Sequence, residues 1–225
     1  MNFIYKKTSR CLLSFGLFWL ISTVMALQYP LPPALVGLYT STGQRYLAES
    51  SYTAPFHKLD HDFVTQKNFF CGIASAVMVL NALQSQYYFT QENIFTRKVR
   101  TILTPGVVRH HGTGIATLAS IFKEFGFQAN HYYGQQLSLR HFRAIVKTSL
   151  SQINHYLIVQ YSRPALHQQG SGHISPIAAY DQKTDRVLIE DVASFNYPPS
   201  WIKLSDLWKA MRYHSHFRGL LLVHG

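Results

Sequence analysis

Cysteine is scarce in this 225-residue chain, which contains Cys11 and Cys71. Cys11 lies in an N-terminal stretch that we expect to be removed, which would leave Cys71 without a partner for an intramolecular disulfide. A lone cysteine of this kind is an inert buried thiol, an intermolecular link or a reactive nucleophile. The choice among these three possibilities decides how the rest of the sequence is interpreted.

Acidic residues are also scarce, with 10 Asp and Glu against 21 Lys and Arg and a formal net charge of +11. The cations are scattered and do not form a stripe interleaved with aromatic residues, which argues against nucleic-acid binding. A solvated basic surface that attracts a small anionic substrate fits this distribution better. No Pro/Gly/Ser-rich linker, internal repeat or low-complexity tract divides residues 27–225, so we expect them to form one domain.

The first 26 residues have the features of a secretory signal peptide. Three cations precede an apolar run from Leu12 to about Met25, no acidic residue occurs, and Val24-Met25-Ala26 provides small residues at a cleavage site. The apolar run of about 14 residues is short for a membrane-spanning helix, which needs about 20. We therefore expect a signal peptide at 1–26, export to the periplasm or outside a bacterial cell, and no membrane attachment after cleavage.

Helices are predicted in the first half of the chain and strands in the second. Residues 27–65 are expected to form an extended lead-in with short turns. Apolar periodicity and capping residues predict helices at 71–83, 90–103 (ended by Thr104-Pro105-Gly106), 113–125, after Ser138 and after Ser205. Runs of β-forming residues predict strands at 155–161, 173–180, 186–192 and 219–224. This order favours an α+β fold over an alternating α/β fold.

A predicted hairpin brings His173 close to an acid. Residues 181–185 form a polar turn, and a turn centre near residue 182 or 183 makes the numbers of paired residues sum to about 364 to 366. His173 then lies opposite Asp191 or its immediate neighbour, where a carboxylate would accept the imidazole N–H. Glu190 would point to the other face, because strand side chains alternate. A register displaced by one residue would exchange the two acids.

Cys71 opens an apolar helix, where the positive end of the helix dipole favours a thiolate. An adjacent His173 would complete a thiolate–imidazolium pair, with Asp191 orienting the imidazole. Gln66 would donate an amide N–H to an oxyanion beside the backbone N–H of Cys71. The order of cysteine, histidine and acid in the chain is that of the papain-like hydrolases.

Three segments resemble the phytochelatin synthase family. Residues 70–75 with 79–83 resemble its nucleophile helix, residues 170–177 its histidine strand, and residues 188–201, which include Tyr-Pro-Pro-Ser-Trp, the segment of its catalytic aspartate. The resemblance covers nearly all of 27–225 and implies a papain-like fold. It also implies that Cys71 attacks the Cys–Gly peptide carbonyl of glutathione, releases glycine and holds a γ-glutamylcysteinyl thioester. Water would then yield γ-Glu-Cys, or a second glutathione would accept the acyl group and yield a phytochelatin.

The resemblance implies further roles and partners. His173 would act as a base on the thiol and as an acid toward the leaving glycine amine. Arg163 and Arg218 would each pair with a substrate carboxylate or, alternatively, form a structural salt bridge. No tightly bound cofactor and no metal site on the protein are expected, since cadmium or zinc would enter as a glutathione thiolate that promotes transpeptidation. The expected partners are glutathione and its metal thiolates, and a homodimer is the assembly to test.

Three features depart from the family pattern. Gln66 is one residue closer to Cys71 than is usual, and Glu190 occupies a position that is usually apolar. We expect the Cys-rich C-terminal region of the plant enzymes to be missing, since the sequence ends at Gly225. Short prokaryotic members mainly remove glycine from glutathione, so hydrolysis is expected to prevail over synthesis.

Two other functions fit parts of the sequence. A secreted papain-like peptidase acting on proteins or peptides would use the same triad and differ in the pocket that recognises a γ-glutamyl group. A periplasmic metal-binding protein would draw on the 12 histidines and the His110-His111 pair. Adjacent histidines seldom chelate one ion together, and the sequence has no CxxC or carboxylate-rich loop to support this second alternative.

Overall fold

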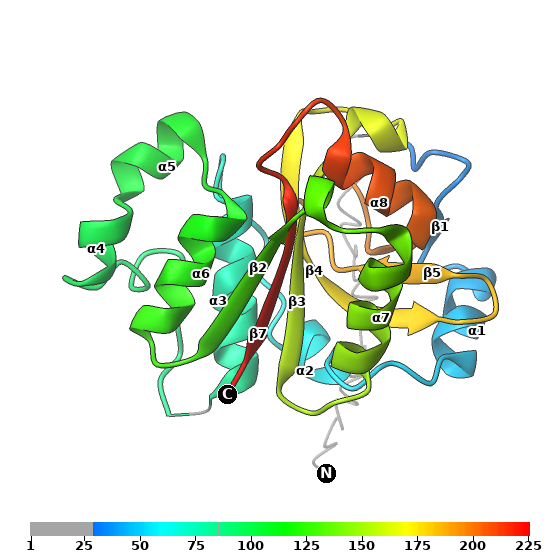
Figure 1. Ribbon diagram of the computed structural model, residues 1–225, viewed down its shortest axis with the longest axis horizontal. Coiled ribbons are helices and arrows are strands. Elements are labelled where there is room, and N and C mark those ends of the chain that lie inside the picture. Colours follow the sequence, from blue (N-terminus) through cyan, green and yellow to red (C-terminus); the bar gives the residue numbers. More distant parts are fainter. Residues whose placement is uncertain (1–28, 85) are drawn as a thin grey trace, which may run out of the picture.

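The computed structural model of the protein describes residues 29–84 and 86–225 (Figure 1). The signal peptide predicted at 1–26 lies outside the described residues. The helices are α1 (Ser41–Glu49), α2 (Phe56–His61), α3 (Cys71–Leu83), α4 (Val99–Ile102), α5 (Pro105–His111), α6 (Ile115–Glu124), α7 (Leu139–Leu150) and α8 (Leu204–Arg212). The strands are β1 (Val36–Gly37), β2 (Gln128–Tyr133), β3 (His155–Ser162), β4 (Gly172–Asp181), β5 (Arg186–Ile189), β6 (Ser200–Lys203) and β7 (Gly219–His224). Within the described residues, no helix is both long and apolar enough to cross a membrane.

In the described part of the chain, the strands form one antiparallel sheet in the order β1-β6-β5-β4-β3-β7-β2. Figure 1 shows α3 and α6 on one side of this sheet and α7 and α8 on the other. Both interfaces are filled by buried apolar side chains, and β3 serves both because its side chains alternate. Tyr156 and Ile158 pack toward α3, whereas Leu157 and Val159 pack toward α7 and α8. This arrangement confirms the predicted α+β class and is consistent with a papain-like fold.

The predicted nucleophile helix is confirmed as α3, with the predicted bounds. Its apolar side chains surround the helix, and Ile73, Val77 and Leu80 are fully buried. A helix that is apolar on most sides is stable only when it is covered on most sides. Gly72 allows this close packing, because a Cβ at that position would clash with the side chain of Thr113. The chain therefore holds Cys71 at the end of a rigid, central element.

The segment between α3 and α6 differs from the prediction. The helix expected at 90–103 is wrong, since helix in that range is limited to α4. Thr90 and Thr96 interrupt it, because their hydroxyl oxygens accept the backbone N–H groups of Asn93 and Val99, both at 3.2 Å. Side chains of this kind compete with continuous helical hydrogen bonding.

Thr104-Pro105, expected to end a helix, instead begins α5. The Thr104 hydroxyl accepts the N–H of Val107, and Pro105 occupies the first turn. Proline is well accommodated there because the first helical N–H groups have no intrahelical acceptor. The lead-in at 27–65 also differs from the prediction, since it contains α1 and α2.

The second half of the chain follows the prediction more closely. The strands predicted at 155–161, 173–180 and 219–224 are confirmed as β3, β4 and β7. Ser138 caps α7 as predicted, accepting the backbone N–H of His141. In contrast, α8 begins without a side-chain cap from Ser205, and β2 and β6 were not predicted. The sequence of β2, Gln-Ala-Asn-His-Tyr-Tyr, is too polar for its burial pattern to be read from the residues alone.

The predicted hairpin exists, but its ladder does not pair His173 with Asp191. Asp181 pairs with Arg186, and an irregularity in β4 then places Ile177 opposite Ile189. Continuing that register would bring Ala193, rather than Asp191, opposite His173. The strand predicted at 186–192 is therefore too long, because β5 ends at Ile189. Asp191 instead contacts His173 from the loop that follows β5.

Candidate active site

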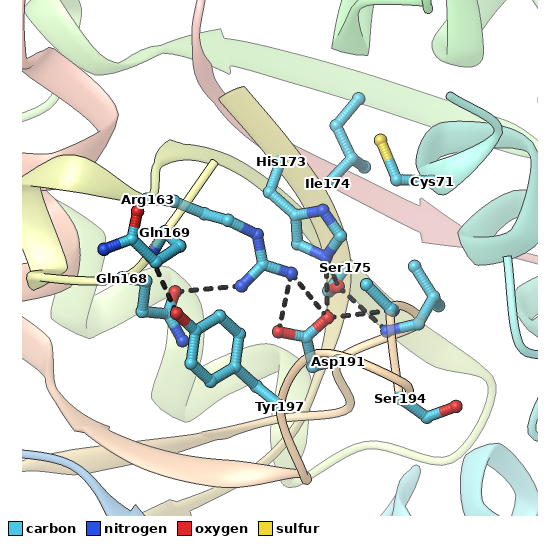
Figure 2. Close-up of polar contacts among 12 residues, drawn as sticks. Cys71, Arg163, Gln168, Gln169, His173, Ile174, Ser175, Asp191, Ser194 and Tyr197 are labelled. Atoms are coloured by element: carbon cyan, nitrogen blue, oxygen red, sulfur yellow. Dashed lines mark hydrogen bonds and ion pairs between the residues drawn. The ribbon is translucent and has the colours of Figure 1, made fainter. Parts of the chain in front are cut away.

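Three segments that are distant in the sequence converge on one cleft. Cys71 begins α3, His173 lies near the start of β4, and Asp191 follows β5. Figure 2 shows the imidazole of His173 between the sulfur of Cys71 and the carboxylate of Asp191. His173 and Asp191 are 4% and 2% exposed, whereas Cys71 is partly exposed. The structure thus brings together the three residues predicted to form a triad.

The acid of this triad is Asp191 rather than Glu190. Nε2 of His173 lies 2.8 Å from Oδ1 of Asp191. Both carboxylate oxygens of Glu190 are buried and have no hydrogen-bond partner among the described residues. Burial, with the nearby charges of Asp60 and Asp191, raises the pKa of Glu190 to about 8. The choice between the two acids, which the hairpin register left open, is decided by this geometry.

The protonation states of the three groups are coupled. Burial raises the pKa of the Cys71 thiol, but the hydrogen bond and charge of His173 outweigh it, so the pKa lies below its usual value. Burial lowers the pKa of His173, but Asp191 reverses the effect and the net pKa is raised. Burial likewise raises the pKa of Asp191, and His173 and Arg163 bring it down to about 2. These directions favour a thiolate beside an imidazolium.

Arg163 forms a buried ion pair with the acid. Its Nη2 lies 2.9 Å from both carboxylate oxygens of Asp191, and its Nη1 donates to Oε1 of Gln168 at 3.1 Å. The guanidinium, 3% exposed, also lies over the ring of Tyr197 at 5.0 Å, and the N–H of Ala193 donates to Oδ1 of Asp191. Of the two roles predicted for Arg163, the structure shows the salt bridge.

Gln66 lies in the same cleft as Cys71, as predicted for an oxyanion donor. Its backbone N–H donates to the carbonyl of Val192 at 2.7 Å, which ties it to the loop that carries Asp191. Its Oε1 is buried and has no partner among the described residues. The backbone N–H of Cys71 stands at the first helical position, where no intrahelical acceptor exists. The oxyanion role of Gln66 stays a prediction.

The cleft that Cys71 and His173 line has a volume of about 530 Å³. Its walls come from α5, from the turn before β4 and from the loop after Asp191, and include His111, Gly170 and Phe195. Arg218 lies against Gly172 at its edge and donates to the carbonyl of Tyr213 at 2.5 Å. Burial lowers the pKa of Arg218. Its predicted contact with substrate stays a prediction.

One residue at the site was not predicted. The hydroxyl oxygen of Ser175 lies 2.9 Å from Nε2 of His173, and Ser175 is completely buried. A signal for it was present in the sequence, because residues two apart on a strand share a face. Among the described residues, including those of the site, no group of three or more His, Cys, Asp or Glu side chains is arranged to hold a metal ion.

Comparisons with known proteins show which family the chain belongs to. The family model described as phytochelatin synthase matches residues 26–219. The chain belongs to the phytochelatin synthase family. Among its relatives in that family, "Glutathione gamma-glutamylcysteinyltransferase 1" of Lotus japonicus is 33% identical, over 86% of this chain and 41% of that protein. The protein of the same name in Triticum aestivum is 32% identical, over 85% of this chain and 40% of that protein.

A more distant member of the phytochelatin synthase family, "Glutathione gamma-glutamylcysteinyltransferase" of Schizosaccharomyces pombe, is 25% identical over 69% of this chain and 39% of that protein. The chain thus spans about two fifths of the length of these three curated relatives, with coverage between 39% and 41%. The triad segments lie within the range that the family model matches.

Proposed function

We propose that this protein is a thiol acyltransferase and hydrolase that acts on glutathione. The observation that carries the proposal is the alignment of Cys71, His173 and Asp191, with Cys71 and His173 lining one cleft and Nε2 of His173 bonded to the buried acid. The names of the relatives, glutathione gamma-glutamylcysteinyltransferases, support glutathione as the substrate. The proposal includes export from the cell, as the N-terminal sequence predicts.

In the first half of the reaction, the Cys71 thiolate attacks the carbonyl carbon of the Cys–Gly peptide bond. Since Nε2 of His173 is occupied by Asp191, Nδ1 is the ring nitrogen that exchanges protons with the thiol and the substrate. The imidazolium gives its proton to the glycine nitrogen as the C–N bond breaks. Glycine leaves, and the γ-glutamylcysteinyl group is held on sulfur as a thioester.

In the second half, the neutral imidazole takes a proton from the acyl acceptor. Water yields γ-Glu-Cys, and the α-amino group of a second glutathione yields a phytochelatin with a new peptide bond. In either case the C–S bond of the thioester breaks, and the proton held by His173 restores the ion pair with Cys71. The proposal keeps the expectation that water is the main acceptor.

The remaining residues have supporting roles in this proposal. The side chain of Gln66 and the backbone N–H of Cys71 would stabilise the oxyanion of the tetrahedral intermediates. Arg163 is committed to Asp191, so Arg218 at the edge of the cleft is the better candidate to pair with a substrate carboxylate. Cadmium or zinc would arrive as a glutathione thiolate, as substrate rather than as a resident cofactor.

The proposal is tested by incubating the protein with glutathione, with and without cadmium. Mass spectrometry then measures glycine, γ-Glu-Cys and longer γ-glutamylcysteinyl oligomers, with Cys71→Ser as the control. The expected result is glycine release that requires Cys71, with γ-Glu-Cys the larger product. Cleavage of casein without turnover of glutathione would replace this proposal with the protein peptidase that shares the same triad.

A further inference from the structure

Ser175 stands at the junction between the histidine strand and the loop of the acid. Its hydroxyl oxygen lies 2.9 Å from Nε2 of His173 and accepts the backbone N–H of Val192 at 3.3 Å. The residue is 0% exposed, so water does not compete for either contact. Figure 2 shows the side chains of His173, Ser175 and Asp191 meeting at this point.

The backbone explains why a side chain is needed at this junction. The β4–β5 ladder ends where the N–H of Glu190 donates to the carbonyl of Pro176. Pro176 has no N–H of its own to continue the pattern. Two residues further along the returning chain, the N–H of Val192 donates to the Ser175 hydroxyl instead of a backbone carbonyl. Asp191 lies between these two anchored residues.

The same loop is anchored on its other side. The carbonyl of Val192 accepts the N–H of Gln66 at 2.7 Å. A continuous path of hydrogen bonds therefore runs from the imidazole of His173, through Ser175 and Val192, to the residue predicted as oxyanion donor. The path does not include Cys71. It connects His173 to Gln66 through Val192, which directly follows Asp191 in the chain.

The hydrogen-bond capacity of the serine fits this arrangement. A hydroxyl oxygen has two lone pairs, and here one faces Nε2–H and the other the N–H of Val192. The proton on Nε2 is thus shared between the carboxylate of Asp191 at 2.8 Å and the Ser175 oxygen at 2.9 Å. Two acceptors on one side of the ring hold its plane and leave Nδ1 toward Cys71.

We infer that Ser175 is a positioning residue that fixes the orientation of His173 and the loop of Asp191 relative to Cys71. The inference rests on the proposed function to the extent that the Cys71–His173 pair performs the chemistry. The titratable and charged groups that surround His173 are Cys71 on α3, Tyr161 on β3, Arg163 after β3 and Asp191 after β5. Ser175 carries no charge, and it acts on geometry and on the imidazolium proton.

The test compares the Ser175→Ala, Ser175→Thr and Ser149→Ala variants of the full chain with the unchanged protein. The rate of alkylation of Cys71 by iodoacetamide is measured against pH, and peptide mass mapping separates Cys71 from Cys11. Ser149, a buried serine on α7, controls for loss of a buried hydroxyl outside the site. The kcat and KM for glycine release from glutathione are measured on the same proteins.

Ser175→Ala is expected to lower kcat about tenfold with little change in KM, the size of effect that one lost hydrogen bond produces. The alkaline limb of the alkylation profile should move to lower pH by about one unit, because the imidazolium loses an acceptor. Ser175→Thr, which keeps the hydroxyl, should restore the profile, and Ser149→Ala should leave it unchanged. An Ala variant that does not fold is replaced by Ser175→Cys, which keeps the volume but provides a weaker acceptor.

An alkylation profile of Ser175→Ala that coincides with that of the unchanged protein would overturn the inference, even if glutathione is turned over. The opposite pattern, a displaced profile in a protein that does not act on glutathione, would leave the positioning role intact and remove the proposed substrate. The alkylation measurement needs no substrate, so the two failures are distinct.

Discussion

Nε2 of His173 lies 2.8 Å from Oδ1 of Asp191, although the strand ladder does not pair the two residues. Asp191 follows the end of β5, and its carboxylate is held by Arg163 and by the N–H of Ala193. The acid is therefore positioned by side-chain and loop contacts rather than by sheet register. Because each contact comes from a different side chain, single substitutions can separate effects on kcat, on KM and on stability.

Replacing Cys71 by Ala or Ser is expected to abolish glycine release from glutathione. The thioester cannot form without the sulfur, and loss of a nucleophile in a triad typically costs about 10⁴-fold or more in kcat. Glycine release is measured by mass spectrometry, and circular dichroism verifies that the variant is folded. Undiminished turnover in the Ala variant would exclude the covalent mechanism.

Asp191→Asn and Glu190→Gln form a matched pair, since each exchanges one carboxylate for an amide. Asp191→Asn should lower kcat by about 10²- to 10⁴-fold, because the imidazole loses the group that orients its tautomer and stabilises its charge. Glu190→Gln should retain activity, as its carboxylate does not contact His173 among the described residues. The reverse result would mean that Glu190 is the functional acid.

Glu190 should make stability fall as the pH rises. Its folded-state pKa is raised from 4.5 to about 8, so the native protein binds a proton that the unfolded chain releases between these values. The stabilising contribution is complete below pH 4.5 and is lost as the pH rises through about 8. Thermal melting at pH 5 and pH 8.5 should show a smaller decrease for Glu190→Gln than for the unchanged protein. Equal decreases in the two proteins would contradict the assignment of this carboxyl.

Arg163→Gln should act mainly on stability. Removing the guanidinium leaves the buried Asp191 without its cation, and breaking a buried ion pair typically costs about 3–5 kcal/mol. Arg218→Gln, at the partly exposed edge of the cleft, should instead raise KM for glutathione with little loss of stability. Urea denaturation and steady-state kinetics of both variants separate the two effects. A normal stability and a raised KM for Arg163→Gln would assign Arg163 to the substrate.

Gln66→Ala should lower kcat by about 10²- to 10³-fold with little change in KM, as expected for loss of one oxyanion donor. Only the side chain is removed, so the backbone bond from Gln66 to Val192 remains. Gln66→Glu, which is of similar size, controls for packing and should be equally impaired, because it offers a negative charge to a developing oxyanion. Wild-type kcat in both variants would show that another donor performs this role.

Much of the site could be predicted from the residues. Cys71 at the start of an apolar helix and His173 at the start of a strand follow from local periodicity and capping, which depend on neighbours in the chain. The bounds of α3 and β7 were predicted in the same way. Helices α4 and α5 were not, because single threonine hydroxyls and Pro105 changed the ends of the segments.

The pairing of His173 with Asp191 was expected for a reason that is wrong in detail. The ladder register would place Ala193 opposite His173. Asp191 makes the contact because hydrogen bonds hold its loop in place. These bonds join Arg163 to Asp191, and Ser175 and Gln66 to Val192. Local sequence patterns do not predict such contacts, because they join residues up to 126 positions apart and packing determines which residues meet.

The order of the chain and the chemistry of its side chains specified a cysteine at the start of an apolar helix, a histidine strand and the α+β class. Tertiary contacts decided which acid lies against the histidine, that Arg163 pairs with this acid, and that the hydroxyl of Ser175 lies within hydrogen-bond distance of the imidazole. The physical reason is burial. In a dry interior each charge and each hydrogen-bonding group must find a partner, and only the folded arrangement determines which partners are within reach.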